Sequence, residues 1–463
     1  MTPSRYRQCL KLFLFSAKIS TVKLILLLIV AIVLIILCTA KWKIHPFLAL
    51  FGVSLGYGLA AGVPLDQLLP AINAGFGGTL EKIGLVILLG VLLGAFLEHS
   101  GGAYSLAHKL LSWIGPKRLH GAMVAIGYLI SIPVFADSGF IIMHSLNKSL
   151  TKQAGFSMAG TGTALMLGLM LTHTMVPPTP GPIAAAGIIN ADLGLVILWG
   201  LIVSFIVMIP AILYSRYYAE RTYIAPHLET ESDEEAPADR PGALHAFLPI
   251  LIPIVLIIAS SVIHQARGES VQPGIQILYF LGNPLMALFI GLLLAMTLPR
   301  KFDLDMLSTT GWTGKALINA SIIILVTGAG GIFGKILEVS GIAGVVKEGL
   351  GGMQIGIWVP FFIAAALKTA QGSSTVALVT TASMIAPIMS TLGFETELQK
   401  ALAVVAIGAG SAVFSHANDS GFWVVTQFTG MDVKTGYKVY SPGTFILGFA
   451  AAIVVFIFYQ AFT

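Results

Sequence analysis

Two short polar stretches interrupt an otherwise apolar sequence, and they contain many of the side chains that could bind a ligand. One is SHANDSGFW, residues 415–423, and the other is THTMVPPTPGP, residues 172–182. Each follows a long apolar run and contains a histidine, hydroxyl side chains and glycine. Hydrocarbon tolerates polar, non-helical backbone only where it is buried in protein or lines a watery cavity. One such interruption in each half of a membrane protein favours a binding site between broken helices.

The stretch 415–423 holds the densest polar cluster of the chain, formed by His416, Asn418, Asp419 and Ser420. Histidine and buried aspartate side chains both titrate, and such pairs at membrane depth are typical of proton relays. The alternative is that Asp419 and Ser420 only cap a helix that begins at Gly421. We expect Asn418 and Ser420 to bind substrate, and His416 and Asp419 to carry protons.

The stretch 172–182 places His173 and Thr174 at the end of an apolar run. The prolines that follow forbid a continuing helix, so backbone amides are left free where the next helix starts. Such amides and the helix dipole favour an anion. The alternative is a buried, satisfied histidine beside a stiff turn. We expect His173, Thr174, Thr179 and Gly181 to bind substrate.

A carboxylate stands in a third break, where Asp137 and Ser138 lie between Pro133 and Gly139. An ionisable group at membrane depth costs at least about 2.5–3.5 kcal/mol unless it is satisfied, so it indicates function. The alternative is a helix cap, in which Asp137 accepts free backbone N–H groups. We expect Asp137 to bind substrate and take part in proton coupling, with Ser138 beside it.

A fourth polar loop is interpreted as the tip of a helical hairpin. It consists of Gln371, Gly372, Ser373, Ser374 and Thr375. Its free N–H groups, three hydroxyls and one amide suit a hydroxylated carboxylate, and we expect all five residues to bind substrate. The alternative is close helix packing through small residues. Lys368, just before the loop, either extends to the membrane interface or balances an anion; we favour the interface.

The composition predicts an all-α polytopic membrane protein. Of the 463 residues, 56% are hydrophobic and 10% are charged, against roughly 25% charged residues in soluble domains. Roughly twelve apolar runs have spanning length. They lie near residues 22–40, 45–62, 80–97, 121–135, 156–175, 192–214, 245–264, 277–298, 316–337, 354–368, 398–414 and 443–460. Shorter pieces near 139–147, 182–190 and 374–389 are interpreted as re-entrant hairpin arms. Basic loops explain the net charge of +5 without a nucleic-acid partner.

The chain divides into two similar halves. The pattern GxxLExSG occurs at residues 94–101 and again at 334–341, an offset of 334 − 94 = 240 residues. The order of the polar breaks also repeats, which indicates a duplicated unit, and the distribution of basic loops favours an inverted second copy. We therefore predict an N-terminal extension (1–20), a first transmembrane repeat (21–214), a cytoplasmic linker (215–245) containing the acidic stretch 229–235, and a second repeat (246–463).

Seven stretches together resemble the gluconate permease (GntP) family of bacterial proton-coupled sugar-acid transporters. They are HPFLAL (45–50), EHSGGAYSLA (98–107), PVFADSGF (133–140), HTMVPPTPGPIAAAGIINADLG (173–194), VTGAGGIFGKILEVSG (326–341), QGSSTVA (371–377) and SHANDSGFW (415–423). The resemblance implies a fold similar to an ion-transporter superfamily, with inverted repeats and paired re-entrant hairpins. It also implies a homodimer with elevator-like movement. Substrates within the family differ, and include gluconate, related aldonates, hexuronates and D-serine.

These features predict a secondary active transporter, a proton symporter that imports gluconate or a related small hydroxylated carboxylate. The alternatives are a D-serine or hexuronate permease of the same family, or, in another class, an intramembrane enzyme or a receptor. An enzyme would need a nucleophile or a set of metal ligands, which the sequence does not offer, and we expect no cofactor and no metal. We expect a multi-pass protein of the bacterial inner membrane, whose partners are the organic acid, protons and lipid.

Overall fold

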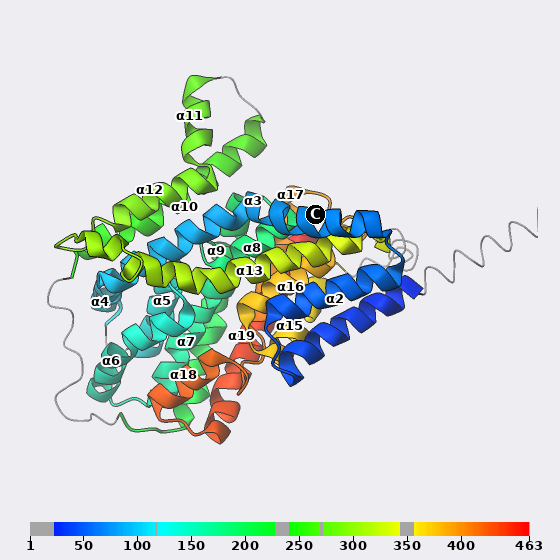
Figure 1. The fold of residues 1–463 in the computed structure, drawn as a ribbon. Coiled ribbons are helices and arrows are strands. Elements are labelled where there is room, and N and C mark those ends of the chain that lie inside the picture. The colour runs from blue at the N-terminus through cyan, green and yellow to red at the C-terminus, as the bar shows by residue number, and fades with distance from the viewer. Residues whose placement is uncertain (1–22, 116–117, 227–239, 269–271, 343–355, 463) are drawn as a thin grey trace, which may run out of the picture.

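The computed structural model describes residues 23–115, 118–226, 240–268, 272–342 and 356–462. All regular elements in these ranges are helices (Figure 1), which confirms the predicted all-α class. The predicted N-terminal extension, residues 1–20, and the acidic stretch 229–235 of the predicted linker lie outside the described residues.

The first half is a run of helices with sequence signals at their ends. They are a helix over Lys23–Thr39 with a π-turn at Leu37–Lys41, then α2 (Pro46–Ala61), α3 (Leu65–His99), α4 (Gly102–Ile114), α5 (Leu119–Ile130), α6 (Ala136–Ala154), α7 (Met158–Met175), α8 (Pro180–Ile189), α9 (Leu193–Tyr217) and a 3-10 turn at Ala219–Arg221. The His45 side chain caps α2, and Gly62, at φ +83°, ends it. Asn190 ends α8 at φ +57°, and Asp192 caps α9.

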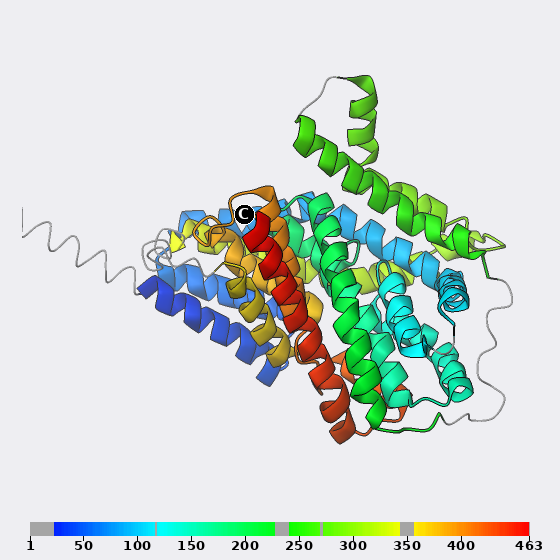
Figure 2. The same cartoon turned by 180° about the vertical axis from the view of Figure 1, so that it is seen from behind.

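The second half follows the same principles. It contains α10 (Ala243–Arg267), α11 (Pro273–Leu281), α12 (Pro284–Ala295), a 3-10 turn at Leu304–Leu307, α13 (Trp312–Val339), α15 (Trp358–Gln371), α16 (Ser374–Ile385), a 3-10 turn at Ala386–Ile388, α17 (Glu397–Ser411), α18 (Ser420–Thr429) and α19 (Val433–Phe462). A reciprocal capping box of Thr396 and Gln399 starts α17. The helix α11 has no buried residue and stands away from the body together with the end of α10 (Figures 1 and 2).

Fewer helices are long enough to span a membrane than the roughly twelve apolar runs predict. Among the described residues, five helices have the length and composition to cross, or six if α11 and α12 count as one span bent by 66°. The predicted run 277–298 is divided between α11 and α12, because Asn283 caps a new helix that begins at Pro284. Several other runs form shorter helices, since prolines, glycines and caps interrupt them.

Two long helices, α3 and α13, cross at glycine. They pack along one side of the molecule (Figure 1), while α9 and α19 lie side by side on the opposite side (Figure 2). At the crossing, a Cβ on Gly75 would lie 2.6 Å from the carbonyl oxygen of Gly331, and a Cβ on Gly331 would collide with the carbonyl oxygen of Gly75. The absence of both side chains therefore lets the two backbones touch.

Four breaks interrupt pairs of helices, and three of them contribute residues to the site described below. They separate α5 from α6, α7 from α8, α15 from α16, and α17 from α18. The breaks predicted within residues 172–182 and 415–423 are confirmed, since α7 ends at Met175 and α18 begins at Ser420. The glycines of α3 support the first two breaks: Gly94 faces the carbonyl oxygen of Pro133, and a Cβ on Gly90 would lie 2.7 Å from that of Pro178.

Candidate functional site

The break before α6 positions Asp137. Pro133 has no N–H to continue helix α5, and the Ser131 hydroxyl donates to the carbonyl oxygen of Val134 at 2.9 Å, which stabilises the turn. Phe135 then takes an extended conformation at the N-cap of α6. Asp137 therefore lies in the first turn of α6, where the helix dipole stabilises negative charge.

The break between α15 and α16 depends on Gly372. This residue has φ +88°, and a Cβ there would collide with the carbonyl oxygen of Asn418, so only glycine fits. Ser373 follows as the N-cap of α16, and its hydroxyl accepts from Val376 N at 3.3 Å. The predicted polar loop is thus a tight turn whose free amides open the next helix.

The break before α18 contains a buried ion pair. Lys368 Nζ lies 2.7 Å from Asp419 Oδ2, and the two side chains are only 1% and 9% exposed. Asp419 also accepts from the Ser415 hydroxyl and, at 3.2 Å, from Gly421 N. Lys368 donates in addition to the carbonyl oxygen of Gly372. The pair therefore ties the end of α15 to the start of α18.

The interpretation of Lys368 as reaching the membrane interface is wrong. Its ammonium group points inward, because Asp419 and the Gly372 carbonyl provide the partners that a buried cation needs. The capping interpretation of Asp419 is confirmed, since it is the N-cap of α18. One carboxylate thus caps a helix and neutralises a lysine.

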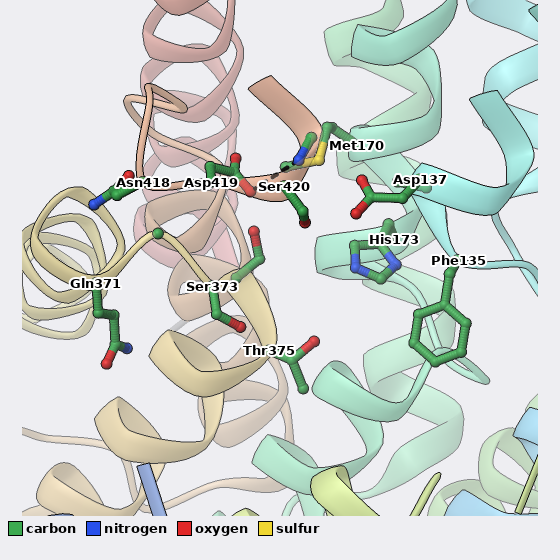
Figure 3. Close-up of a pocket in the computed structure, with 14 residues that line it drawn as sticks. Phe135, Asp137, Met170, His173, Gln371, Ser373, Thr375, Asn418, Asp419 and Ser420 are labelled. Atoms are coloured by element: carbon green, nitrogen blue, oxygen red, sulfur yellow. Dashed lines mark hydrogen bonds between the residues drawn. The ribbon is translucent and has the colours of Figure 1, made fainter. Parts of the chain in front are cut away.

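These breaks enclose a cavity of about 380 Å³. Its wall is formed by Phe135, Ala136, Asp137, Met170, His173, Gln371, Gly372, Ser373, Ser374, Thr375, Asn418, Asp419, Ser420 and Gly421. The N-terminal ends of α6, α16 and α18 all contribute to it. Figure 3 shows Asp137 and His173 on one side of the cavity, facing Ser373 and Ser420 on the other. Three helix N-termini that converge on one space create a site suited to negative charge.

Several buried polar atoms of the cavity wall lack partners. Among the described residues, His173 Nδ1, Asn418 Oδ1 and both polar atoms of the Gln371 side chain make no hydrogen bond. Asn418 Nδ2, by contrast, donates to Thr369 O at 2.9 Å and Ala370 O at 3.1 Å. Since buried polar groups are normally paired, these atoms are available to a polar ligand.

The charged groups of the cavity differ in whether they have an ion-pair partner. Lys368 and Asp419 neutralise each other, whereas Asp137 has no Lys, Arg or His within ion-pair distance among the described residues. The Ser420 side chain lies beside it (Figure 3). Asp137 is therefore the carboxylate of the cavity that has no protein cation in direct contact.

Ten of the predicted site residues meet in this cavity. They are Asp137, His173, Gln371, Gly372, Ser373, Ser374, Thr375, Asn418, Asp419 and Ser420. Sequence reasoning missed the apolar wall residues Phe135 and Met170, and it kept the anion-balancing role of Lys368 only as the less favoured alternative. Met170 precedes His173 by three residues and so shares its helix face, which is a signal that could have indicated it.

Five predicted residues lie elsewhere. The Thr174 hydroxyl donates to Met170 O at 2.9 Å and that of Thr179 to Val176 O at 2.7 Å, so both are satisfied by nearby backbone. Gly181 packs against Leu378 of α16. His416 is turned to the carbonyl oxygen of Thr369, 2.7 Å from its Nε2. Ser138 faces a neighbouring cavity and lies beside Glu98.

Comparison with known proteins gives a consistent picture. A family model described as GntP family permease matches residues 23–461. The chain is 35% identical to the inner membrane permease YgbN of Escherichia coli K12, covering 94% of this chain and 98% of the relative. It is 34% identical to a gluconate permease of Zymomonas mobilis (94% and 97% covered) and 31% identical to the high-affinity gluconate transporter of Escherichia coli K12 (89% and 94%).

Among solved structures, the chain is similar to the YdaH transporter of Alcanivorax borkumensis. The TM-score is 0.63 at 14% identity, and the match covers 89% of this chain and 97% of that one. This likeness shows a shared fold. The named relatives are permeases and transporters rather than enzymes. With a family match over nearly its whole length, the chain belongs to the GntP permease family of membrane proteins.

Proposed function

We propose that this permease is a proton symporter that imports gluconate or a related small hydroxylated carboxylate across the bacterial inner membrane. The observation that carries the proposal is the cavity at three of the helix breaks, where three helix N-termini and unpaired polar atoms meet. Several relatives are named as gluconate permeases or transporters, which supports this substrate class.

The substrate carboxylate is placed at the N-terminal ends of α16 and α18. The side chains of Ser373 and Ser420 are exposed to the cavity there, and the amides of the first helical turns provide further donors. The hydroxyl groups of the substrate then face the free polar atoms of His173 and Asn418. The Lys368–Asp419 pair adds no net charge but fixes both helix starts.

We assign the coupled proton to Asp137. Bringing an anion into a negative-inside cell costs about 2.3 kcal/mol per charge per 100 mV, and cotransported protons offset this. Asp419 is a weaker candidate because Lys368 stabilises its charge at 2.7 Å. His416 is outside the cavity. Asp137 faces the cavity without a paired cation, so a proton taken up with the substrate removes its repulsion of a second carboxylate.

We further propose that residues 21–214 and 246–463 form inverted repeats joined by the cytoplasmic linker 215–245. The described elements support this division, because a long helix, two interrupted helix pairs and a closing helix occur in the same order twice: α3 to α9 and α13 to α19. We also propose a homodimer. Light scattering of the purified protein in detergent would contradict the dimer if it gave the mass of one chain.

The test is uptake by proteoliposomes with an imposed pH gradient, using labelled gluconate, glucuronate and D-serine. Wild-type protein is expected to accumulate gluconate only when the outside is acidic. Asp137→Asn should retain exchange of substrate for substrate at equal pH and lose gradient-driven accumulation. Asp305→Asn, in an exposed turn away from the cavity, is the control and should behave as wild type.

Two results would contradict these assignments separately. If wild-type proteoliposomes take up none of the three compounds, the proposed function is wrong. If Asp137→Asn accumulates gluconate as well as wild type does, the transporter assignment stands and Asp137 does not carry the proton.

A further inference from the structure

A second cavity of about 350 Å³ adjoins the first. Phe135, Asp137, Ser373 and Thr375 line both cavities. Four shared wall residues, contributed by the start of α6 and the start of α16, show that the two spaces adjoin each other there. The function proposed above uses only the first cavity.

The far wall of the second cavity comes from α13. Its lining residues there are Asn319, Ile322, Ile323 and Val326. They follow the spacing of one helix face. Asn319 is the only polar member of this set, and its side chain makes no hydrogen bond to another described residue. The Asn319 side chain is exposed at this cavity, so its amide is free to contact a polar group there.

We propose that the two cavities form one elongated substrate site and that Asn319 is its specificity-determining residue for chain length. This inference rests on the proposed function and extends it. The carboxylate binds at the starts of α16 and α18, the carbon chain passes Phe135 and Thr375, and the terminal hydroxyls reach the Asn319 amide.

The length of the substrate decides whether Asn319 is reached. A six-carbon acid such as gluconate has five carbon–carbon bonds of about 1.5 Å each, and a three-carbon acid such as glycerate has two. In the proposed arrangement gluconate extends from the first cavity into the second, and glycerate stays in the first. The Asn319 amide offers two donors and one acceptor, which match alcohol groups, and Ile322 and Ile323 match the C–H faces of the chain.

The experiment compares binding of glycerate, threonate and gluconate, with three, four and six carbons, to purified protein by isothermal titration calorimetry. Removing one hydrogen bond to a neutral hydroxyl weakens binding by about 2- to 13-fold. Asn319→Ala is expected to weaken gluconate binding within this range and to leave glycerate binding unchanged. Ser321→Ala is the control on the same helix, since its hydroxyl donates to Ile318 O at 2.7 Å and lines neither cavity.

A second variant keeps the test informative if Asn319→Ala fails to fold. Ile322→Trp enlarges a side chain that is already 54% exposed, and it fills the second cavity. It should also weaken gluconate binding more than glycerate binding. Equal weakening of all three acids, or no change in gluconate binding by either variant, would refute the role of α13 in specificity. Failure of the wild-type protein to bind any of these acids would instead refute the proposed function.

Discussion

Replacing Lys368 by methionine tests the buried ion pair directly, because it removes the cation and keeps an unbranched side chain of similar length. The partner carboxylate of Asp419 then stays at its 9% exposure without a counterion. Removing one member of a buried pair costs about 3–5 kcal/mol of folding stability. Asp419 keeps two donors, the Ser415 hydroxyl and Gly421 N, so Lys368→Met should lie near the lower end, about 3 kcal/mol.

Removing the anion of the pair should lower the folding stability more than removing the cation. In Asp419→Asn, the lysine loses its anion, and its other partner is the carbonyl oxygen of Gly372. We therefore expect a loss nearer 5 kcal/mol. The double variant contains neither charge. Its loss should fall short of the sum of the single losses by about 2–3 kcal/mol, as for other residues in direct contact.

The measurement is reversible denaturation of the purified protein in detergent at neutral pH, for wild type, both single variants and the double variant. Lys400→Met is the matched control, because Lys400 pairs with Glu397 at the same 2.7 Å distance but at 24% and 46% exposure. It should lose less than about 1 kcal/mol. Additive losses in the double variant, or a Lys368→Met loss no larger than that of the control, would refute the reasoning.

Two further predictions concern the helix framework. Gly331→Ala places a methyl group against the backbone of Gly75 and should destabilise the protein by about 1–3 kcal/mol, whereas Gly78→Ala, with nothing within 4 Å of the added carbon, should be neutral in the same denaturation assay. Cysteines at His99 and Val339, both exposed, should react with an impermeant maleimide from opposite sides of the membrane; labelling of both from the same side would exclude inverted repeats.

The breaks of the site are predictable from sequence because their causes are local. Pro133 and the prolines after residue 176 end helices wherever they stand, and the Asp419-Ser420 pair is a typical cap. Polar residues in apolar surroundings also need partners, which is why Ser373 and His173 could be assigned to a site. The order of the breaks along the chain then brings both halves to one place.

The direction of individual side chains is not local and could not be predicted. Thr174 and Thr179 have the same hydroxyl as Ser373, but theirs bond to carbonyls of the preceding turn. Lys368 points inward because of Asp419, which follows 51 residues later. Asn319 is one amide in an apolar helix, and only its position in a cavity shared with the start of α6 indicates a binding role.

The glycine crossing of α3 and α13 also constrains how the protein is made. During synthesis α3 enters the membrane first, and the elements from α4 to α12 must follow before α13 leaves the ribosome. Contacts between segments so distant in sequence form late. Until then the Gly75 face of α3 lacks the helix that covers it, although the same helix already supports the breaks at Pro133 and Pro178. The first half therefore completes its packing only after the second half has been made.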